Sequence, residues 1–148
     1  MRMASNIISC VHTTMSLEVV QRSFGDVTVL KFKGWINASA YPYLTRLIKE
    51  LIAQGKSKFV FDCAEVAYVD SVGNSFSVVA YVAARNSGGS VKISEPSKTM
   101  SGVLALTRLS TMFEIYERTE DAIVAFGGDP KRQDGELVLH KCTADSPP

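Results

Sequence analysis

The sequence contains few of the residues on which most metal and catalytic sites are built. Its 148 residues include two histidines, His12 and His140, and three cysteines. Because Cys10, Cys63 and Cys142 are widely spaced and form no CxxC pair, they predict free thiols and support neither a zinc site nor a disulfide framework. The sequence therefore gives no reason to expect a bound metal or cofactor.

Long apolar runs and clusters of one charge sign are also missing. No uninterrupted apolar run approaches the roughly 20 residues needed to span a bilayer, and the N-terminus lacks the apolar segment of a signal peptide. The formal net charge is +1, and no run of lysine or arginine offers a surface to a polyanion. We therefore expect a cytoplasmic protein with no nucleic-acid partner and no direct membrane insertion.

The common motifs of nucleotide-binding proteins and hydrolases are absent as well. No G-x-x-x-x-G-K-[ST] or G-x-G-x-x-G segment opens a helix after a strand, so nucleotide binding is unsupported. A Ser-His-Asp triad centred on Ser71 would need His12 or His140 to fold back from an end of the chain. The sequence favours a protein that is not an enzyme, and a hydrolase dependent on His140 stays as an alternative.

The composition is that of one folded domain. Hydrophobic residues make up 46% of the chain and charged residues 21%, which is ordinary for a globular protein of this length. Polarity and turn residues predict a flexible leader over residues 1–16, a domain over 17–126 and a tail over 127–148. In that tail, residues 137–139 are apolar, and they either add to a sheet edge, bind a partner or are disordered.

The apolar periodicity predicts alternating strands and helices. Strands are expected at residues 17–20, 27–33, 59–61, 91–94 and 113–116, and helices at 39–54, 71–84, 97–109 and 119–126. Gly34 is expected to end the second strand, and Ser39 to cap the first helix, with Pro42 in its first turn. The order β-β-α-β-α-β-α-β-α predicts an α/β fold, a mixed sheet of about five strands packed with about four helices.

The stretch from residue 59 to residue 85 joins a buried strand to a helix through one polar junction, Asp70-Ser71. Both residues are good helix N-caps, so the junction predicts a serine held at a helix N-terminus. The carboxylates of Asp62, Glu65 and Asp70 could together ligate a hard cation. Carboxylates near strand ends are more often solvated or capping groups, so no metal site is predicted.

The helix that follows has no charged side chain from Ser71 through Ala84. Helices on a protein surface normally carry a charged stripe. Helical spacing predicts an inward stripe of Val72, Phe76, Val79 and Ala83. The outer face would then present Asn74, Ser75, Ser77, Val78, Tyr81 and Val82. An uncharged face of this kind is typical of a surface covered by a protein partner, although a second layer of the same domain could also cover it.

Several motifs carry a resemblance to a known family. Val69-Asp70-Ser71-Val72-Gly73 is similar to a hydrophobic-D-S-x-G signature, and Gly34 stands where G-x-[L/I]-[D/N] is expected. Gly88-Gly89 precedes a strand, and residues 106–116 are similar to L-x-x-[S/G]-L-x-x-[L/F]-F-x-[I/V]-[Y/F]. On these motifs residues 17–126 resemble a STAS domain, the fold of bacterial anti-sigma factor antagonists and of cytoplasmic domains of sulfate transporters.

The chain departs from the family pattern near the expected partner surface. Trp35 replaces a commonly acidic residue, Asn37 stands where aspartate is frequent, and residues 73–75 read Gly-Asn-Ser where the family often has Gly-Leu-Gly. These differences concern the identity of the partner more than the fold.

The resemblance implies an anti-sigma factor antagonist in a partner-switching pathway. Such a protein binds an anti-sigma factor that is a GHKL-type serine kinase, and is released when that kinase phosphorylates the serine of the signature, here Ser71. A cognate phosphoserine phosphatase would be a further partner. The expected partner-binding residues are Asn37, Asp70, Ser71, Val72, Asn74, Ser75, Val78 and Tyr81. The alternative is a STAS domain that does not switch, serving a transport or lipid-trafficking assembly or binding a small ligand, with Ser71 only capping a helix.

Overall fold

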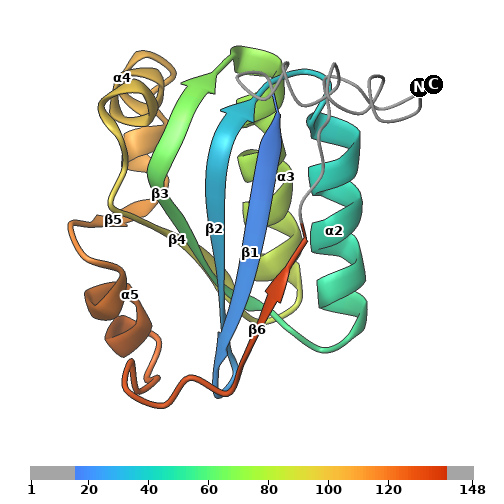
Figure 1. Cartoon of the computed structure of the whole chain (residues 1–148), viewed down its shortest axis with the longest axis vertical. Coiled ribbons are helices and arrows are strands. Elements are labelled where there is room, and N and C mark those ends of the chain that lie inside the picture. The colour runs from blue at the N-terminus through green and yellow to red at the C-terminus, as the bar shows by residue number, and fades with distance from the viewer. Residues whose placement is uncertain (1–15, 140–148) are drawn as a thin grey trace, which may run out of the picture.

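The computed structural model describes residues 16–139, which form a mixed sheet with helices on both faces (Figure 1). The elements are β1 (Leu17–Phe24), β2 (Val27–Ile36), α2 (Tyr41–Ala53), β3 (Lys58–Val69), α3 (Ser71–Asn86), β4 (Ser90–Ser94), α4 (Lys98–Leu106), the 3-10 turn η2 (Leu109–Thr111), β5 (Glu114–Tyr116), α5 (Thr119–Ala125) and β6 (Gly135–Val138). The predicted α/β alternation is confirmed. Within residues 16–139 the sheet has six strands, slightly more than the expected five.

The strand order is β5-β4-β3-β2-β1-β6, with β2 to β5 parallel and β1 antiparallel to both its neighbours. The helices α2, α3 and α4 each connect adjacent parallel strands, and all three connections step in the same direction across the sheet. Because such crossovers are right-handed, these helices lie on one face. Helix α5 follows the last parallel strand and packs against the opposite face.

Apolar side chains form a large cluster on the face covered by α2, α3 and α4. At its centre the rings of Phe32, Phe61 and Phe76 join β2, β3 and α3, with centroid separations of 5.3 to 5.6 Å. A smaller cluster on the other face joins Phe24 and Val29 to Ile123 of α5. Full burial of such a side chain contributes about 1.5–3 kcal/mol, so the larger cluster dominates the stability of the domain.

Gly34 does not end the second strand, contrary to the prediction, because β2 continues to Ile36. The backbone of Gly34 has φ +115, and the pairing with β3 shifts register between Gly34 and Trp35. A Cβ at Gly34 would lie 2.2 Å from the carbonyl oxygen of Ser16. Glycine here allows an irregularity within the strand. A glycine in the sequence can mark either such an irregularity or the end of a strand, and the sequence alone does not distinguish the two.

The start of α2 also differs from the prediction. Ala40, not Ser39, is the N-cap residue, and it makes no side-chain cap hydrogen bond. The Oδ1 atom of Asn37 instead accepts a hydrogen bond of 3.1 Å from the backbone N–H of Ala40. Pro42 lies in the first turn as expected. Asn37 therefore shapes the turn between β2 and α2.

The C-terminal segment adds a strand to the edge of the sheet, which confirms the sheet-edge alternative for residues 137–139. In the antiparallel pairing of β6 with β1, Val138 lies opposite Val20. The N–H of Leu139 donates to the oxygen of Val19 at 2.6 Å, and the hydroxyl of Tyr43 donates to the oxygen of Leu139 at 2.5 Å. These bonds tie residues 135–139 to both β1 and α2.

Cys63 is a buried free thiol, as predicted, and burial raises its pKa well above the usual range. Cys10, Cys142, His12 and His140 lie outside the described residues. Within residues 16–139 no group of three or more metal-binding side chains is assembled. In the same range no helix combines the length and the apolar character needed to cross a bilayer.

Candidate phosphorylation and partner-binding site

The adjacent ends of β2 and β3 hold the Asp70-Ser71 junction at one end of the sheet (Figure 1). Ile36 pairs with Val69 in the parallel register of these strands. The backbone N–H of Asp70 then donates to the carbonyl oxygen of Ile36 at 3.2 Å. The junction between β3 and α3 is therefore fixed to β2 through its own backbone.

Asp70 caps α3, as the sequence predicts. Its backbone is extended, with φ −111 and ψ 172, and its Oδ1 atom accepts a hydrogen bond of 2.7 Å from the N–H of Gly73. Ser71 is the first residue of α3 and is exposed. Because Asp70 supplies the cap, the side chain of Ser71 is not needed for that role.

Gly73 allows α3 to approach β2 closely. A Cβ at this position would lie 2.2 Å from the carbonyl oxygen of Ile36 and 2.8 Å from the carbonyl carbon of Asn37. Both contacts are with backbone, which cannot move aside as a flexible side chain could. The sequence motif includes Gly73 but does not reveal this structural reason, which depends on the neighbouring strand.

The predicted inward stripe of α3 is wrong apart from Phe76. Val72 is 52% exposed, and Val79 and Ala83 are only partly buried. The buried residues are Gly73, Asn74, Phe76, Ser77, Ala80 and Ala84. Most of them are small, because α3 packs closely against its neighbours. A prediction based on apolar residues places Val72 and Val79 on the buried face, whereas the buried face consists mainly of smaller residues.

Three residues expected on the outer face are covered by the domain itself. Asn74 and Ser77 are buried, and the hydroxyl of Ser77 donates to the carbonyl oxygen of Asn74 at 2.7 Å. Tyr81 packs edge to face on Phe113, with ring centroids 5.3 Å apart. For these residues the alternative of a second layer of the same domain is correct.

The other expected partner-binding residues lie around Ser71 with varied exposure. Asn37, Ser75 and Val78 are half-buried, and Ser75 donates a hydrogen bond of 2.5 Å to the carbonyl oxygen of Val72. Val82, one of the residues expected on the outer face, is 50% exposed. One side of α3 carries the exposed residues Ser71, Val72 and Val82 and the half-buried residues Ser75 and Val78, and we call these five residues the open α3 face.

An aromatic pair lies at the same end of the sheet. Trp35 of β2 is in register with Tyr68 of β3, and their rings stack with centroids 4.2 Å apart and planes inclined by 25°. Tyr68 is 36% exposed and Trp35 is partly exposed. The sequence motifs single out Trp35 but miss Tyr68. No sequence signal was available for this pair, because β2 and β3 extend to Ile36 and Val69, beyond the predicted strands 27–33 and 59–61.

Replacement of the capping residue should weaken α3 without removing its fold. We expect Asp70→Ala to lower the free energy of unfolding by about 0.5–2 kcal/mol, because the N–H of Gly73 loses its acceptor. Asp70→Asn keeps a side-chain oxygen for that bond and should cost much less. Urea denaturation measures both values, and an equal loss in the two variants would show that the charge rather than the cap matters.

Two neighbouring positions of α3 should respond differently to lysine. Tyr81→Lys removes the packing on Phe113, and we expect a clear fall in melting temperature, since such aromatic pairs contribute about 0.5–1.5 kcal/mol beyond their buried area. Val82→Lys should change stability by no more than about 0.5 kcal/mol because Val82 is half exposed. Thermal denaturation measures both variants. An equal fall in melting temperature for Tyr81→Lys and Val82→Lys would mean that Val82 is part of the core.

Residues 18–122, which are more than half of the chain, match the family model of the STAS domain. The protein belongs to the STAS domain family. This agrees with the resemblance drawn from the D-S-x-G motif and with the observed α/β sheet.

Solved structures share the fold at low sequence identity. An anti-sigma factor antagonist from Mycobacterium paratuberculosis is 23% identical with a TM-score of 0.67, covering 74% of this chain and 93% of that one. The Bacillus cell fate determinant SpoIIAA in its phosphorylated form is 19% identical with a TM-score of 0.59, covering 72% and 98%. A sulfate transporter family protein from Wolinella succinogenes is 14% identical with a TM-score of 0.59, covering 69% and 84%. At these sequence identities, the three structures show that the fold is shared and nothing further.

Proposed function

We propose that this protein is a non-catalytic anti-sigma factor antagonist that works by partner switching. The observation that carries the proposal is an exposed serine, Ser71, at the start of α3, beside an aspartate that already caps the helix. The fold likeness to anti-sigma factor antagonists supports this role, since SpoIIAA, solved in a phosphorylated form, is itself described as such an antagonist. Unphosphorylated protein binds an anti-sigma factor, and phosphorylation at Ser71 releases it.

A phosphate on Ser71 is compatible with the fold. The first turn of α3 has backbone N–H groups without helical acceptors, and Asp70 uses only the N–H of Gly73. The positive end of the helix dipole favours a negative group here, and the exposed position of Ser71 leaves the phosphate in water. Phosphorylation should therefore leave the stability of the domain nearly unchanged.

The same phosphate is unfavourable in an interface. It adds a charge of about −1.5 to −2 next to Asp70, and a partner pressed against the open α3 face would have to desolvate it. Val72 and Val82 give this face exposed apolar surface, which contributes to binding only when water is excluded. A switch follows, because the modification affects the complex and not the fold.

The partner that fits this mechanism is a bacterial anti-sigma factor that is itself a GHKL-type serine kinase acting in the cytoplasm. The binding surface comprises Asp70, the open α3 face and the aromatic pair, with Asn37 at its margin. Trp35 and Tyr68 alternate with the core residues Ile36 and Val69, so the pair projects from the sheet face opposite α3, at the same end. Because Trp and Tyr are enriched among residues that dominate binding energy, we include the pair as the part that a partner extending round this end would contact. A phosphoserine phosphatase completes the cycle and returns the protein to its binding state.

Mass spectrometry after incubation with the cognate kinase and ATP tests the proposal. We expect one phosphate per chain, mapped to Ser71, and none in Ser71→Ala. Ser75→Ala is the matched control, because Ser75 lies one turn along the same face and should not be the acceptor. Absence of phosphate at Ser71, with binding to the kinase unaffected, would favour a STAS domain that does not switch and serves a transport assembly.

A further inference from the structure

A cavity of about 260 Å³ lies on the α5 face of the sheet, on the other side from α3. Its strand side is formed by Arg22, Lys31 and Asp62, and its α5 side by Glu95, Thr119 and Gln133. We call this space the α5 cavity. It plays no part in the proposed partner switch.

Asp62 places a buried carboxylate in the α5 cavity. Its side chain is only 6% exposed, and its Oδ1 atom accepts a hydrogen bond of 3.1 Å from the N–H of Ala64. The nearest cation, Arg22, places Nη2 3.9 Å from Oδ2, which is too long for a hydrogen bond. Burial raises the pKa of Asp62, an effect that the Ala64 N–H and Thr119 partly offset. Asp62 has one backbone donor, and its cationic neighbours Arg22 and Lys31 make no short bond to it, so the carboxylate would gain from a further donor.

Glu95 brings a second carboxylate from the turn after β4. Its backbone has φ +50, a conformation that residues other than glycine rarely adopt and that is often found at functional positions. This conformation lets Oε2 accept a hydrogen bond of 2.9 Å from the N–H of Thr119. Within residues 16–139 Glu95 has no ion-pair partner. Its charge is therefore balanced by a backbone N–H at the start of α5 and by no basic side chain among these residues.

The charges around the cavity are separated by sign. Arg22 and Lys31 lie on β1 and β2, whereas Asp62, Glu95 and Glu120 lie on β3, the turn after β4, and α5. Lys31 pairs at 2.9 Å with Glu65, which is not part of the cavity lining. Arg22 contacts Asp62 at 3.9 Å and lies over the ring of Phe24 at 5.8 Å, and neither contact is a hydrogen bond from its guanidinium. A ligand with one positive and one negative group would match both sides.

We propose that the α5 cavity binds a small zwitterion of the free amino-acid class. The ammonium group would lie toward Glu95 and Asp62, and the carboxylate toward Arg22. The volume of about 260 Å³ is below the roughly 300–1,000 Å³ of pockets for drug-sized ligands, which restricts the ligand to a small molecule. The neighbouring amide of Gln133 provides a further hydrogen-bonding group, whereas the hydroxyl of Thr119 is already bonded to that of Ser94 at 2.7 Å.

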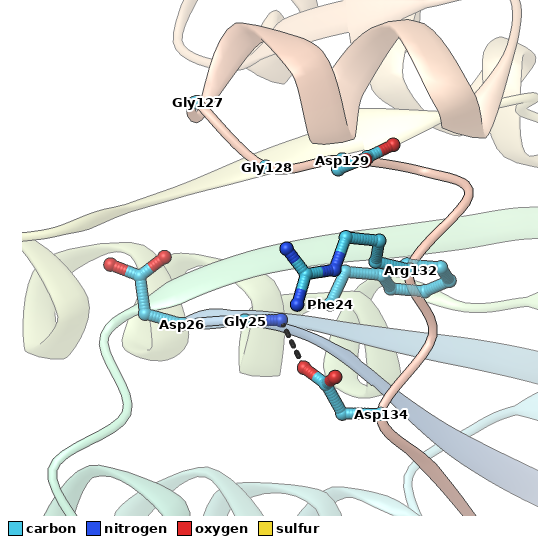
Figure 2. A pocket seen from close by; sticks show the side chains of 8 residues that line it. All are labelled: Phe24, Gly25, Asp26, Gly127, Gly128, Asp129, Arg132 and Asp134. Atoms are coloured by element: carbon cyan, nitrogen blue, oxygen red, sulfur yellow. Dashed lines mark hydrogen bonds between the residues drawn. The ribbon is translucent and has the colours of Figure 1, made fainter.

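A second cavity nearby, of about 290 Å³, lacks these features (Figure 2). Its polar lining is exposed, and its carboxylates are already engaged: Asp134 accepts from Gly25 N–H at 2.6 Å, and Asp26 pairs with Lys58 at 2.8 Å. Figure 2 shows the guanidinium of Arg132 between the β1–β2 turn and Gly128. No buried polar side chain lines that space, so it carries no ligand site.

Titration of the ¹⁵N-labelled full chain with each of the twenty standard amino acids, followed by NMR, tests this proposal without any kinase. We expect at least one amino acid to shift the amide signals of Arg22, Asp62, Glu95 and Thr119 in a saturable manner. Methylamine and acetate, which each carry one of the two charges, should bind far more weakly. No saturable shift with any amino acid, or equal shifts with acetate or methylamine alone, would overturn the assignment of a zwitterion site.

Substitutions in the α5 cavity test whether the amino acid binds there. Glu95→Gln keeps an oxygen for the Thr119 N–H but loses the charge, and should weaken the best amino acid about tenfold. Arg22→Gln should do the same from the opposite side. Lys58→Gln is the matched control, since it breaks an exposed ion pair outside the α5 cavity and should leave affinity unchanged. If one cavity variant fails to fold, the other decides, and unchanged affinity in a folded cavity variant places the ligand elsewhere.

Discussion

Ser71→Asp and Ser71→Glu should fold like the unmodified protein and bind the anti-sigma factor kinase about 100- to 1,000-fold more weakly. The expected penalty of about 3–4 kcal/mol is that of desolvating an added charge beside Asp70 in an interface. Ser71→Ala should bind with normal affinity and resist phosphorylation, because the cap is made by Asp70 and not by the serine. Calorimetric titration against the kinase measures all three affinities.

Ser87→Asp is the matched control for this series. Ser87 is an exposed serine at the opposite end of α3, so the same substitution adds the same charge away from the proposed interface. Its affinity should equal that of the unmodified protein. The switch at Ser71 is excluded if the acidic variants at position 71 bind as tightly as Ser71→Ala, provided that their thermal melts show them to be folded.

Gly73→Ala should destabilise the domain strongly, although it adds only one methyl group. That methyl group would lie 2.2 Å from the carbonyl oxygen of Ile36, so α3 would have to move away from β2. Overpacking of this kind typically costs about 1–3 kcal/mol and occasionally more, and the obstacle at this position is backbone. We expect a large fall in the urea midpoint. Partner binding should fall as well, since Ser71 moves with the start of α3.

Gly102→Ala in α4 is the control for Gly73→Ala. Apart from its chain neighbours and the backbone of its own helix, no atom lies within 4 Å of the position a Cβ would take at Gly102, and the residue is exposed inside a helix. Alanine there should be neutral or stabilise by up to about 1 kcal/mol, because glycine is the poorer helix former. If Gly73→Ala and Gly102→Ala had equal urea midpoints, the stability of the domain would not depend on the close approach of α3 to β2.

The alternation of strands and helices could be predicted because it rests on local periodicity. Leu44, Leu47, Ile48 and Leu51 recur at helical spacing, and all four are buried in α2. Strand β6 could not be predicted with the same certainty. Its four residues are all exposed, and it exists through pairing with β1, more than one hundred residues earlier in the chain.

The Asp70-Ser71 junction was predictable for a similar local reason, whereas the face of α3 was not. An N-cap depends on a residue and the turn after it, and the bond from Gly73 to Asp70 spans only three residues. Which side of a helix is buried depends on the size of the space it enters. Gly73, Ser77 and Ala80 fill a narrow space, and Val72 is left exposed.

The α5 cavity could not be predicted from the sequence. Arg22, Asp62 and Glu95 come from three separate elements and meet only through the strand order β4-β3-β2-β1. The left-handed conformation of Glu95 carries no sequence signal, since glycine is the residue expected at such a position.

The most direct measurement compares the affinity of the kinase for the protein before and after phosphorylation, with a non-hydrolysable nucleotide present so that neither form changes during the titration. We predict tight binding of the unphosphorylated protein and about 100- to 1,000-fold weaker binding of the protein carrying phosphate on Ser71, with identical thermal melts for the two forms. Equal affinity of the two folded forms would contradict partner switching at Ser71.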